Sequence, residues 1–450
     1  MIRYRARWVV PISAPPIAHG VVAVEGDRIE YVGPLVGAPE GEDDDLGDVI
    51  LLPGLVNVHC HLELTAMRGF LEDLDFRRWI LRLTSARRAV LDRDALLDSA
   101  RYGLEEGVRA GITTYGDTCD SGVVMQAMRE AGVRGVMYQE VFGPSPAQCA
   151  ESIAGLREKV AALRYLETPL VRLGVSPHAP YTVSDDLFRA TSALARELHL
   201  PMAIHIAESA AEHALVVEGT GALADGLRRR GIEVARRGDS PIGLLHRLDV
   251  LDRRPLLIHC VRVDDDDIAT IAESRSPVAH CPVSNAKLGH GAAPLSELRA
   301  AGVLVGIGSD SVASNNRMDV LAEARFSLLV QRGRLASSET PDAIDVLEMA
   351  TIGGAEALGL GDVIGTLDRG KQADLAAFSL ARARPTFDPV TAAVFSITGA
   401  DAVFATVAGR PLLRGGRLQS PRAGLDDRME TIARSLADWM AAGGELQGVT

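Results

Sequence analysis

Short apolar runs recur along most of the chain, and stretches with helical spacing of apolar residues separate them. Eight such runs lie between residues 51 and 310, at 51–61, 112–117, 135–143, 171–178, 201–208, 255–261, 277–284 and 303–310. Continuous apolar strands that alternate with helices are typical of parallel strands buried on both faces. Eight such units predict an α/β fold of the (β/α)8 type, a TIM barrel. A doubly wound sheet is the alternative, but no GxGxxG motif follows the first run.

Helices are predicted between the runs, for example at 93–110, 152–164, 184–198 and 212–230. Four consecutive aspartates at 264–267 follow the sixth run. We interpret them as the start of a helix, where the helix dipole favours negative charge, and not as a metal site.

Both ends of the chain carry short strand patterns separated by turns. Strands are predicted at 5–10, 20–25, 28–33, 402–408 and 411–413, with a turn-rich entry into another strand at 364–378. We expect these strands to form a small β-sandwich domain built from both chain ends. The acidic segment 40–45 is predicted to be a solvated loop, and 351–360 and 426–442 are predicted helices. The expected division is 1–52 and 359–416 for the sandwich, 53–358 for the barrel and 417–450 for a C-terminal helix.

Composition limits the classes of partner. The 450 residues are 47% hydrophobic, enough for one large barrel with appendages. The net charge of −13 argues against nucleic acid and anionic membranes as partners, because both bind basic surfaces. The five cysteines form no CxxC pair, which suits a reducing compartment, and no segment approaches the roughly 20 apolar residues of a membrane span. No signal-peptide pattern is visible. We expect a cytoplasmic protein with a small-molecule substrate, and a homodimer is an open alternative to a monomer.

Each apolar run carries a polar side chain at or near its end. In chain order these are His61, Asp117, Glu140, His178, His205 with Glu208, His259, His280 and Asp310. The carboxyl ends of barrel strands share one rim, and barrel enzymes place their chemistry there. These side chains are therefore expected to lie at one site.

His59 and His61 form an HxH pair at the end of the first run. Residues i and i+2 of a strand point to the same face, so the two imidazoles project together and Cys60 points away. They supply half of a metal site, although two core histidines would explain an isolated pair equally well. A catalytic zinc-type ion takes three or four protein ligands and keeps a position for water. His205 and Asp310 are the predicted third and fourth ligands.

Several motifs together resemble the amidohydrolase superfamily and span nearly the whole chain. They are PGLVNVHCH at 53–61, GITT at 111–114, SPHAPY at 176–181, HIAE at 205–208, HC at 259–260, AHCPVSN at 279–285, GSDS at 308–311 and GKQADL at 370–375. The chain is most similar to the branch of cytosine-deaminase-like enzymes, chlorohydrolases of the ATZ/TRZ type and nucleoside deaminases. The resemblance implies one divalent metal ion, Zn2+, with Fe2+ and Mn2+ as alternatives. Members with two ions carry a carboxylated Lys on the fourth strand, whereas residues 171–178 hold no Lys and end in His178.

Three residues are expected to carry the chemistry. The metal lowers the pKa of a water toward ~7, and Asp310 accepts its proton. His259 is expected to hydrogen-bond the hydroxide and to stabilise the tetrahedral centre. Glu208 is expected to deliver a proton to a ring nitrogen of the substrate, and Asp310 then protonates the leaving ammonia. The alternative for Glu208 is a surface carboxylate at the start of the next helix.

Substrate contacts are predicted from the rim and from one loop. The candidates are His178, Glu140, His280, Ser314 and Trp79, with Asp117 and Asn315 as further rim residues. Each of these could instead support the site from behind. In related nucleoside deaminases, the residue that corresponds to His178 contacts the substrate.

Residues 70–79 predict a lid, in which Phe70, Phe76 and Trp79 either cover a heterocycle or pack the loop. Adenosine-type members of the family would have a Glu in this lid, and the chain has Arg77 and Arg78 instead. This difference argues against simple deamination of methylthioadenosine or adenosylhomocysteine.

The sequence favours a metal-dependent hydrolase of C–N bonds other than peptide bonds, a deaminase of an aminated heterocycle such as a purine-type nucleoside. The runs at 61–65 and 140–143 look loosely similar to aminodeoxyfutalosine deaminases. A chlorohydrolase or cyclic-amide hydrolase is the enzymatic alternative. A non-catalytic scaffold is disfavoured because all four predicted ligands are present.

Overall fold

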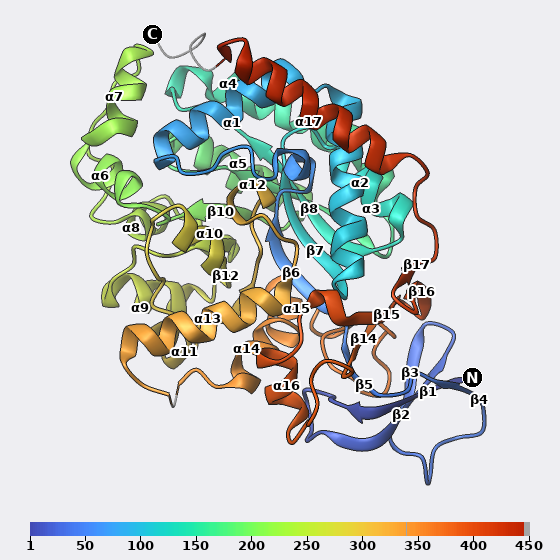
Figure 1. Ribbon diagram of the computed structural model, residues 1–450. Coiled ribbons are helices and arrows are strands. Elements are labelled where there is room, and N and C mark those ends of the chain that lie inside the picture. Colours follow the sequence, from blue (N-terminus) through green and yellow to red (C-terminus); the bar gives the residue numbers. More distant parts are fainter. Residues whose placement is uncertain (339, 445–450) are drawn as a thin grey trace.

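The computed structural model describes residues 1–338 and 340–444, and two four-stranded parallel sheets form its centre (Figure 1). The first sheet holds β6 (Leu55–Cys60), β7 (Ile112–Cys119), β8 (Arg134–Val141) and β9 (Val171–Pro177). The second holds β10 (Ala203–Ile206), β11 (Leu256–His259), β12 (Val278–His280) and β13 (Val305–Ile307). Each strand overlaps one of the eight apolar runs, so the predicted strands are confirmed.

Backbone hydrogen bonds connect the two sheets at both edges. Between β9 and β10, the His205 N–H donates to His178 O at 3.0 Å. Between β13 and β6, the Asp310 N–H donates to His59 O at 2.9 Å. The carboxyl ends of the eight strands therefore lie at one rim, in an α/β fold of the TIM-barrel type.

Helices connect successive strands. Their bounds are α1 (Phe76–Val90), α2 (Arg93–Arg109), α3 (Val123–Ala131), α4 (Cys149–Leu163), α5 (Asp185–Leu198), α6 (Ala210–Glu218), α7 (Gly221–Arg229), α8 (Pro241–Arg247), α9 (Asp265–Ser274), α10 (Pro282–Lys287), α11 (Leu295–Ala300), α12 (Val312–Asn315), α13 (Val320–Leu335), α14 (Ala343–Met349), α15 (Ile352–Ala357) and α16 (Pro389–Phe395). The single helix predicted at 212–230 is two helices, because Gly219 adopts a left-handed backbone (φ 68°) and ends α6. Asp264 caps α9 and accepts from the Asp267 N–H, which confirms that the aspartates start a helix.

The strands of the two chain ends form one nine-stranded sheet, at the lower right of Figure 1. Its members are β1 (Ile2–Val9), β2 (Ile17–Glu25), β3 (Arg28–Pro34), β4 (Glu42–Asp45), β5 (Val49–Pro53), β14 (Leu375–Ser379), β15 (Ala402–Val407), β16 (Arg410–Arg414) and β17 (Arg417–Leu418). The predicted pairing of both chain ends is confirmed, whereas a separate β-sandwich domain stays a prediction. The buried Arg134 of β8 ties this sheet to the parallel strands through Asp374, with Nε and Oδ2 2.7 Å apart.

The prediction of a solvated loop at 40–45 is wrong for its second part. Residues 42–45 form β4, which pairs in parallel with β1. Arginines offset the acidic charge of this strand, since Arg3 lies 2.6 Å from Asp43 and Arg414 lies 2.8 Å from Asp44. Acidic residues are rare in strands, so the sequence favoured a loop.

A terminal helix, α17 (Leu425–Ala441), was predicted at 426–442 and is confirmed. It lies against α1 and α2 (Figure 1), and the rings of Phe70 and Trp439 meet at 6.4 Å between centroids. Residues 445–450 of the predicted C-terminal segment lie outside the described residues. In the described part of the chain, every helix is too short or too polar to cross a membrane.

Candidate active site

A cavity of about 240 Å³ opens at the carboxyl-terminal rim of the parallel strands. The rim residues that line it are His61, Glu140, His178, His205, Glu208, His259 and Asp310. Helix α1 adds an apolar wall that includes Phe76, Trp79, Ile80 and Leu83. The structure therefore brings most of the predicted site residues to one place.

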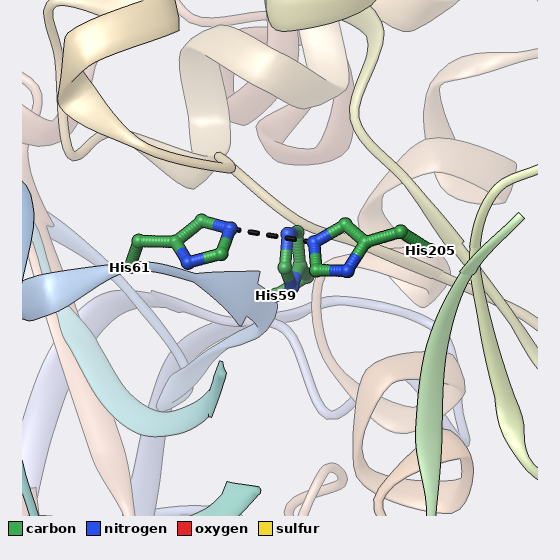
Figure 2. A group of neighbouring side chains, drawn as sticks. All are labelled: His59, His61 and His205. Carbon is green, nitrogen blue, oxygen red and sulfur yellow. Dashed lines mark hydrogen bonds between the residues drawn. The ribbon is translucent and has the colours of Figure 1, made fainter. Parts of the chain in front are cut away.

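Three histidines gather beneath this cavity with their rings around a common point (Figure 2). The ring centroid of His59 is 4.8 Å from that of His61 and 4.9 Å from that of His205. The Nε2 atoms of His61 and His205 are 3.4 Å apart. Cys60 points away toward β7, with Sγ 3.5 Å from Gly116 O. The alternation of the strand thus places the two histidines of the HxH pair on the same face.

Asp310 closes the cluster from the end of β13. Its Oδ1 lies 3.3 Å from His59 Nε2 and 3.4 Å from His61 Nε2. Ser284 and Ser314 donate to Oδ2 at 2.5 and 3.2 Å, so Oδ1 is left facing the imidazoles. Asp310 has φ 56°, a left-handed conformation that is strained for a residue other than glycine. Such strain is concentrated at functional sites.

These four side chains fit a divalent metal ion. Tetrahedral zinc with bonds of about 2.0–2.1 Å would hold neighbouring ligand atoms roughly 3.3 Å apart, and the separations observed here are 3.3 and 3.4 Å. His61 Nδ1 donates to Thr118 O at 3.0 Å and His205 Nδ1 to His178 O at 3.2 Å, which leaves a lone pair on each Nε2. Among the described residues, the buried Nε2 of His59 has no hydrogen-bond partner.

Charge also favours metal binding at the cluster. Burial lowers the pKa of His59, His61 and His205, so the neutral imidazoles that bind metals prevail at pH 7. Burial acts to raise the pKa of Asp310, but the neighbouring His59 outweighs it, and the pKa lies well below its ordinary value. Three neutral imidazoles and one carboxylate form a donor set that suits zinc.

Glu208 faces the cavity between two imidazoles. Its Oε1 is 3.6 Å from His259 Nε2 and 3.4 Å from His290 Nε2. The buried carboxylate of Glu212 fixes the preceding turn, because it accepts from the backbone N–H groups of Ala207 and Glu208 at 2.8 and 2.9 Å. Burial acts to raise the pKa of Glu208, but His259 and His290 outweigh it, and the pKa lies below its ordinary value. A carboxyl group placed in this way can exchange a proton with a molecule in the cavity.

The end of the cavity at β8 and β9 carries two polar side chains, His178 and Glu140, that face each other. Thr182 Oγ1 donates to Ala179 O at 3.1 Å, so His178 Nδ1 donates to Thr182 at 2.7 Å and its Nε2 is left as an acceptor. This Nε2 lies 4.0 Å from Oε1 of Glu140, a buried atom without a hydrogen-bond partner among the described residues. Burial raises the pKa of Glu140 well above its ordinary value and lowers the pKa of His178 to about 3.

Two predicted substrate contacts, Ser314 and His280, are buried outside the cavity lining. Ser314 Oγ lies 2.9 Å from Ser284 Oγ and donates to Asp310 Oδ2 at 3.2 Å. His280 at the end of β12 is 2% exposed and lies behind the lining. The further candidates Asp117 and Asn315 also have structural partners, since Asp117 accepts from the Leu62 N–H at 2.7 Å and Asn315 donates to Ser309 O at 2.7 Å.

The predicted lid at 70–79 divides into two parts. Phe76 and Trp79, on the first turn of α1, line the cavity. Phe70 packs against Trp439 of α17 instead. Arg77 and Arg78 stand outside the cavity lining, and Arg78 pairs with Asp75 at 3.5 Å. Arg77 and Arg78 are thus not in a position to contact a molecule in the cavity, and residues 76–79 contain no Glu.

Sequence reasoning missed four charged or titratable residues near the cavity. Glu63 accepts from Arg87 Nη2 at 2.8 Å, and Arg87 Nη1 lies 3.5 Å from Asp120, so all three line the far end of the cavity. His290, beside Glu208, is the fourth. Glu63 follows His61 by two positions, which was a usable signal, whereas Arg87 is one of several arginines on α1 and could not be singled out.

Comparison with known proteins establishes the family. Residues 50–412 match the amidohydrolase family. This chain belongs to the amidohydrolase family. A 5-methylthioadenosine/S-adenosylhomocysteine deaminase of Moorella thermoacetica is 34% identical over 419 residues, which cover 92% of this chain and 94% of the relative. The predicted superfamily is thus confirmed.

Solved structures agree with the fold. A zinc-bound adenosine deaminase from Xanthomonas campestris superimposes with a TM-score of 0.86 and 28% identity, covering 98% of both chains. The atrazine chlorohydrolase TrzN of Arthrobacter aurescens, complexed with zinc, gives 0.82 at 23% identity over 97% of this chain and 100% of TrzN. The aminofutalosine deaminase of Helicobacter pylori gives 0.80 at 20% over 92% and 100%. The last two likenesses show the fold alone.

Proposed function

We propose that this amidohydrolase catalyses the hydrolytic deamination of an aminated purine-type nucleoside. One observation carries the proposal: Glu208 lines the same cavity as His61, His205 and Asp310 of the metal cluster, so a proton donor and a water-activating group flank one pocket. The activities of the relatives support it, because they deaminate adenosine or its derivatives. Aminodeoxyfutalosine, suggested by the runs at 61–65 and 140–143, is a further candidate of the same class.

We propose one zinc ion per chain, held by His59, His61, His205 and Asp310. When bound, a divalent ion acts as a Lewis acid that lowers the pKa of water toward about 7. Among the described residues, two further groups lie within ligand distance: His59, His259 and Asp310, which share the first site, and Glu140, His178 and His205.

The last of these groups would be a separate site. It is a poor second site, because His205 Nδ1 already donates to His178 O and its Nε2 faces the first cluster.

The proton transfers belong to the chain's own side chains. Asp310, held by two serine hydroxyls through Oδ2, takes a proton from the attacking water and returns it to the departing ammonia. The Glu208 carboxyl group gives a proton to the ring nitrogen beside the carbon under attack, and it takes one back from the hydroxyl on that carbon as ammonia leaves. His259 donates from Nδ1 to Asn285 Oδ1 at 2.9 Å, which turns its Nε2 toward the cavity to orient the water.

The sugar of the nucleoside would occupy the end of the cavity at β8 and β9. There the free acceptor of His178 and the unpaired oxygen of Glu140 need donors, and ribose hydroxyls supply them. Trp79 and Phe76 give the heterocycle an apolar wall. The relative that acts on 5-methylthioadenosine and S-adenosylhomocysteine brings both compounds into the set of substrates to test.

A substrate screen tests the proposal. Zinc-loaded protein is incubated with adenosine, 5-methylthioadenosine, S-adenosylhomocysteine, a guanine nucleoside, a cyclic amide and a chlorinated triazine, and the ammonia and chloride released are measured. We expect ammonia from at least one purine nucleoside. Chloride release, or ring opening without ammonia, would instead establish the chlorohydrolase or cyclic-amide hydrolase reaction. Inactivity on every nucleoside would contradict the proposal.

We also propose that the two parallel sheets close into one barrel spanning residues 53–358. The hydrogen bonds at the edges between β9 and β10 and between β13 and β6 support this architecture. The sandwich formed by 1–52 and 359–416, a homodimer and a cytoplasmic location remain predictions.

A further inference from the structure

Glu208 has a second imidazole neighbour that no sequence motif indicated. His290 lies in the segment between α10 and α11, with Nε2 3.4 Å from Glu208 Oε1. His259 approaches the same oxygen at 3.6 Å from the other side. Both imidazoles therefore approach the same oxygen of Glu208, which leaves Oε2 for a substrate.

One asparagine positions both of these imidazoles. Asn285 accepts from His259 Nδ1 through its side-chain oxygen at 2.9 Å, and its backbone carbonyl accepts from the His290 N–H at 2.8 Å. Gly289 and Gly291 flank His290 with φ 72° and 110°, conformations that residues with side chains rarely adopt. The local backbone is thus shaped to present this histidine at a defined place.

The first turn of α1 also covers His290. Its side chain is 5% exposed, and its ring meets the ring of Phe76 edge-on, with 4.8 Å between centroids and 81° between planes. Phe76 is the first residue of α1 and lines the cavity. Among the described residues, His290 Nε2 has no hydrogen-bond partner. The carboxylate that lies within ion-pair distance of this nitrogen is that of Glu208. A buried imidazole nitrogen without a hydrogen-bond partner calls for an explanation, and an action on Glu208 provides one.

We propose that His290 is a positioning residue for Glu208: its Nε2–H holds Oε1 and so aims Oε2 at the ring nitrogen of the substrate. The inference rests on the proposed deamination, in which Glu208 is the proton donor. Long contacts of this type shorten when substrate closes an active site, and a donor that is misaligned transfers protons slowly. The competing explanation is that His290 only fills space beneath Phe76.

Two substitutions separate these explanations. His290→Phe keeps an aromatic ring against Phe76 but removes the donor, and His290→Gln keeps an N–H donor of similar reach. We expect His290→Phe to lower kcat roughly 10- to 100-fold with KM changed much less, and His290→Gln to recover part of the loss. Zinc content and melting temperature, measured on each variant, should match those of the wild type. His246→Gln, on the exposed side of α8, is the matched control for a histidine replacement.

The decisive readout is the same His290→Phe substitution made in a Glu208→Gln background. If His290 acts through Glu208, it should have almost no further effect on kcat there, because the group it positions no longer transfers a proton. An equal fold-loss in both backgrounds, or a His290→Gln variant as slow as His290→Phe, would overturn the inference. An active wild type with an unimpaired His290→Phe would overturn the inference alone, whereas a wild type without deaminase activity would overturn the proposed function together with it.

Discussion

The two ends of the cavity differ in how their polar groups are hydrogen-bonded. At the metal end, carbonyl oxygens fix His61 and His205, and serine hydroxyls fix Asp310, so each group is left with one atom directed at a common point. At the other end, Glu140 keeps a buried oxygen without a partner in the described part of the chain, and His178 keeps an acceptor nitrogen. At the first end the protein itself fixes these groups, which would hold an ion, whereas at the second end we propose that a substrate supplies the missing partners.

From this contrast we expect the metal end to determine reactivity and the other end to determine substrate selectivity. The metal end stands on β6, β10 and β13 of the parallel sheets, with β13 hydrogen-bonded to β6 through the Asp310 N–H and His59 O. The other end combines β8 and β9 with residues of α1, a helix outside the sheets that packs against α17. Changes at the metal end should therefore impair every substrate equally, and changes at the other end should depend on the substrate.

The largest effect is expected from the ligands. His61→Ala should remove the metal and bring activity on all substrates below detection, because the site loses an imidazole from its set of four predicted ligands. Elemental analysis of purified protein checks this, with wild type expected to hold one ion per chain. Close to two tightly bound ions per wild-type chain would refute the single-ion site.

Glu208→Gln should have the next largest effect. The amide has no proton to give to the ring nitrogen, so turnover should fall by about 10²–10⁴ or more, while metal content and fold are unchanged. Steady-state kinetics with parallel metal analysis measures both quantities. Near-normal turnover at full metal content would remove Glu208 from the mechanism.

Glu140→Ala and His178→Ala should show the selectivity of the other end. Each removes a partner of a substrate hydroxyl and should weaken transition-state binding of the nucleoside by about 1–3 kcal/mol, seen as a lower kcat/KM. The free base lacks these hydroxyls and should be affected much less. Equal losses on nucleoside and base would mean that this end does not recognise the sugar.

The smallest effect, a loss of metal affinity, is expected from replacing either of the two serines that donate to Asp310. Ser284 donates to Oδ2 at 2.5 Å and Ser314 at 3.2 Å. Loss of the Ser284 hydroxyl should therefore weaken metal binding more than loss of the Ser314 hydroxyl, each by about 0.5–1.5 kcal/mol. Metal competition with a chelator ranks Ser284→Ala against Ser314→Ala. A larger effect of Ser314→Ala would show that these distances do not govern how Asp310 is held.

The metal end could be predicted from sequence because each of its ligands stands at or near the end of a predicted strand. Strand alternation alone places His59 and His61 on one face, and the barrel rule brings His205 and Asp310 to the same rim. The fold was predictable for the same reason, since each apolar run is itself a strand. The acidic strand β4 was missed because its charges are offset by Arg3 and Arg414, one of which is far away in the chain.

The other contacts could not be predicted in this way. His290 meets Glu208 only because a loop between two glycines folds under α1, and Arg87 meets Glu63 only because α1 crosses the rim. Both contacts depend on tertiary packing that no periodic pattern encodes. Ser314 was placed correctly at the rim by its position after β13, but its partner turned out to be Asp310.

The central claim is that water replaces an amino group on a purine ring within this cavity. The most direct test runs zinc-loaded enzyme on its best purine nucleoside in water enriched in oxygen-18, with mass analysis of the product and a parallel assay for ammonia. The account predicts one ammonia for each nucleoside consumed and one oxygen-18 atom on the base of an otherwise intact nucleoside. A product without the label, or one in which the glycosidic bond is cleaved and no ammonia is released, would contradict it.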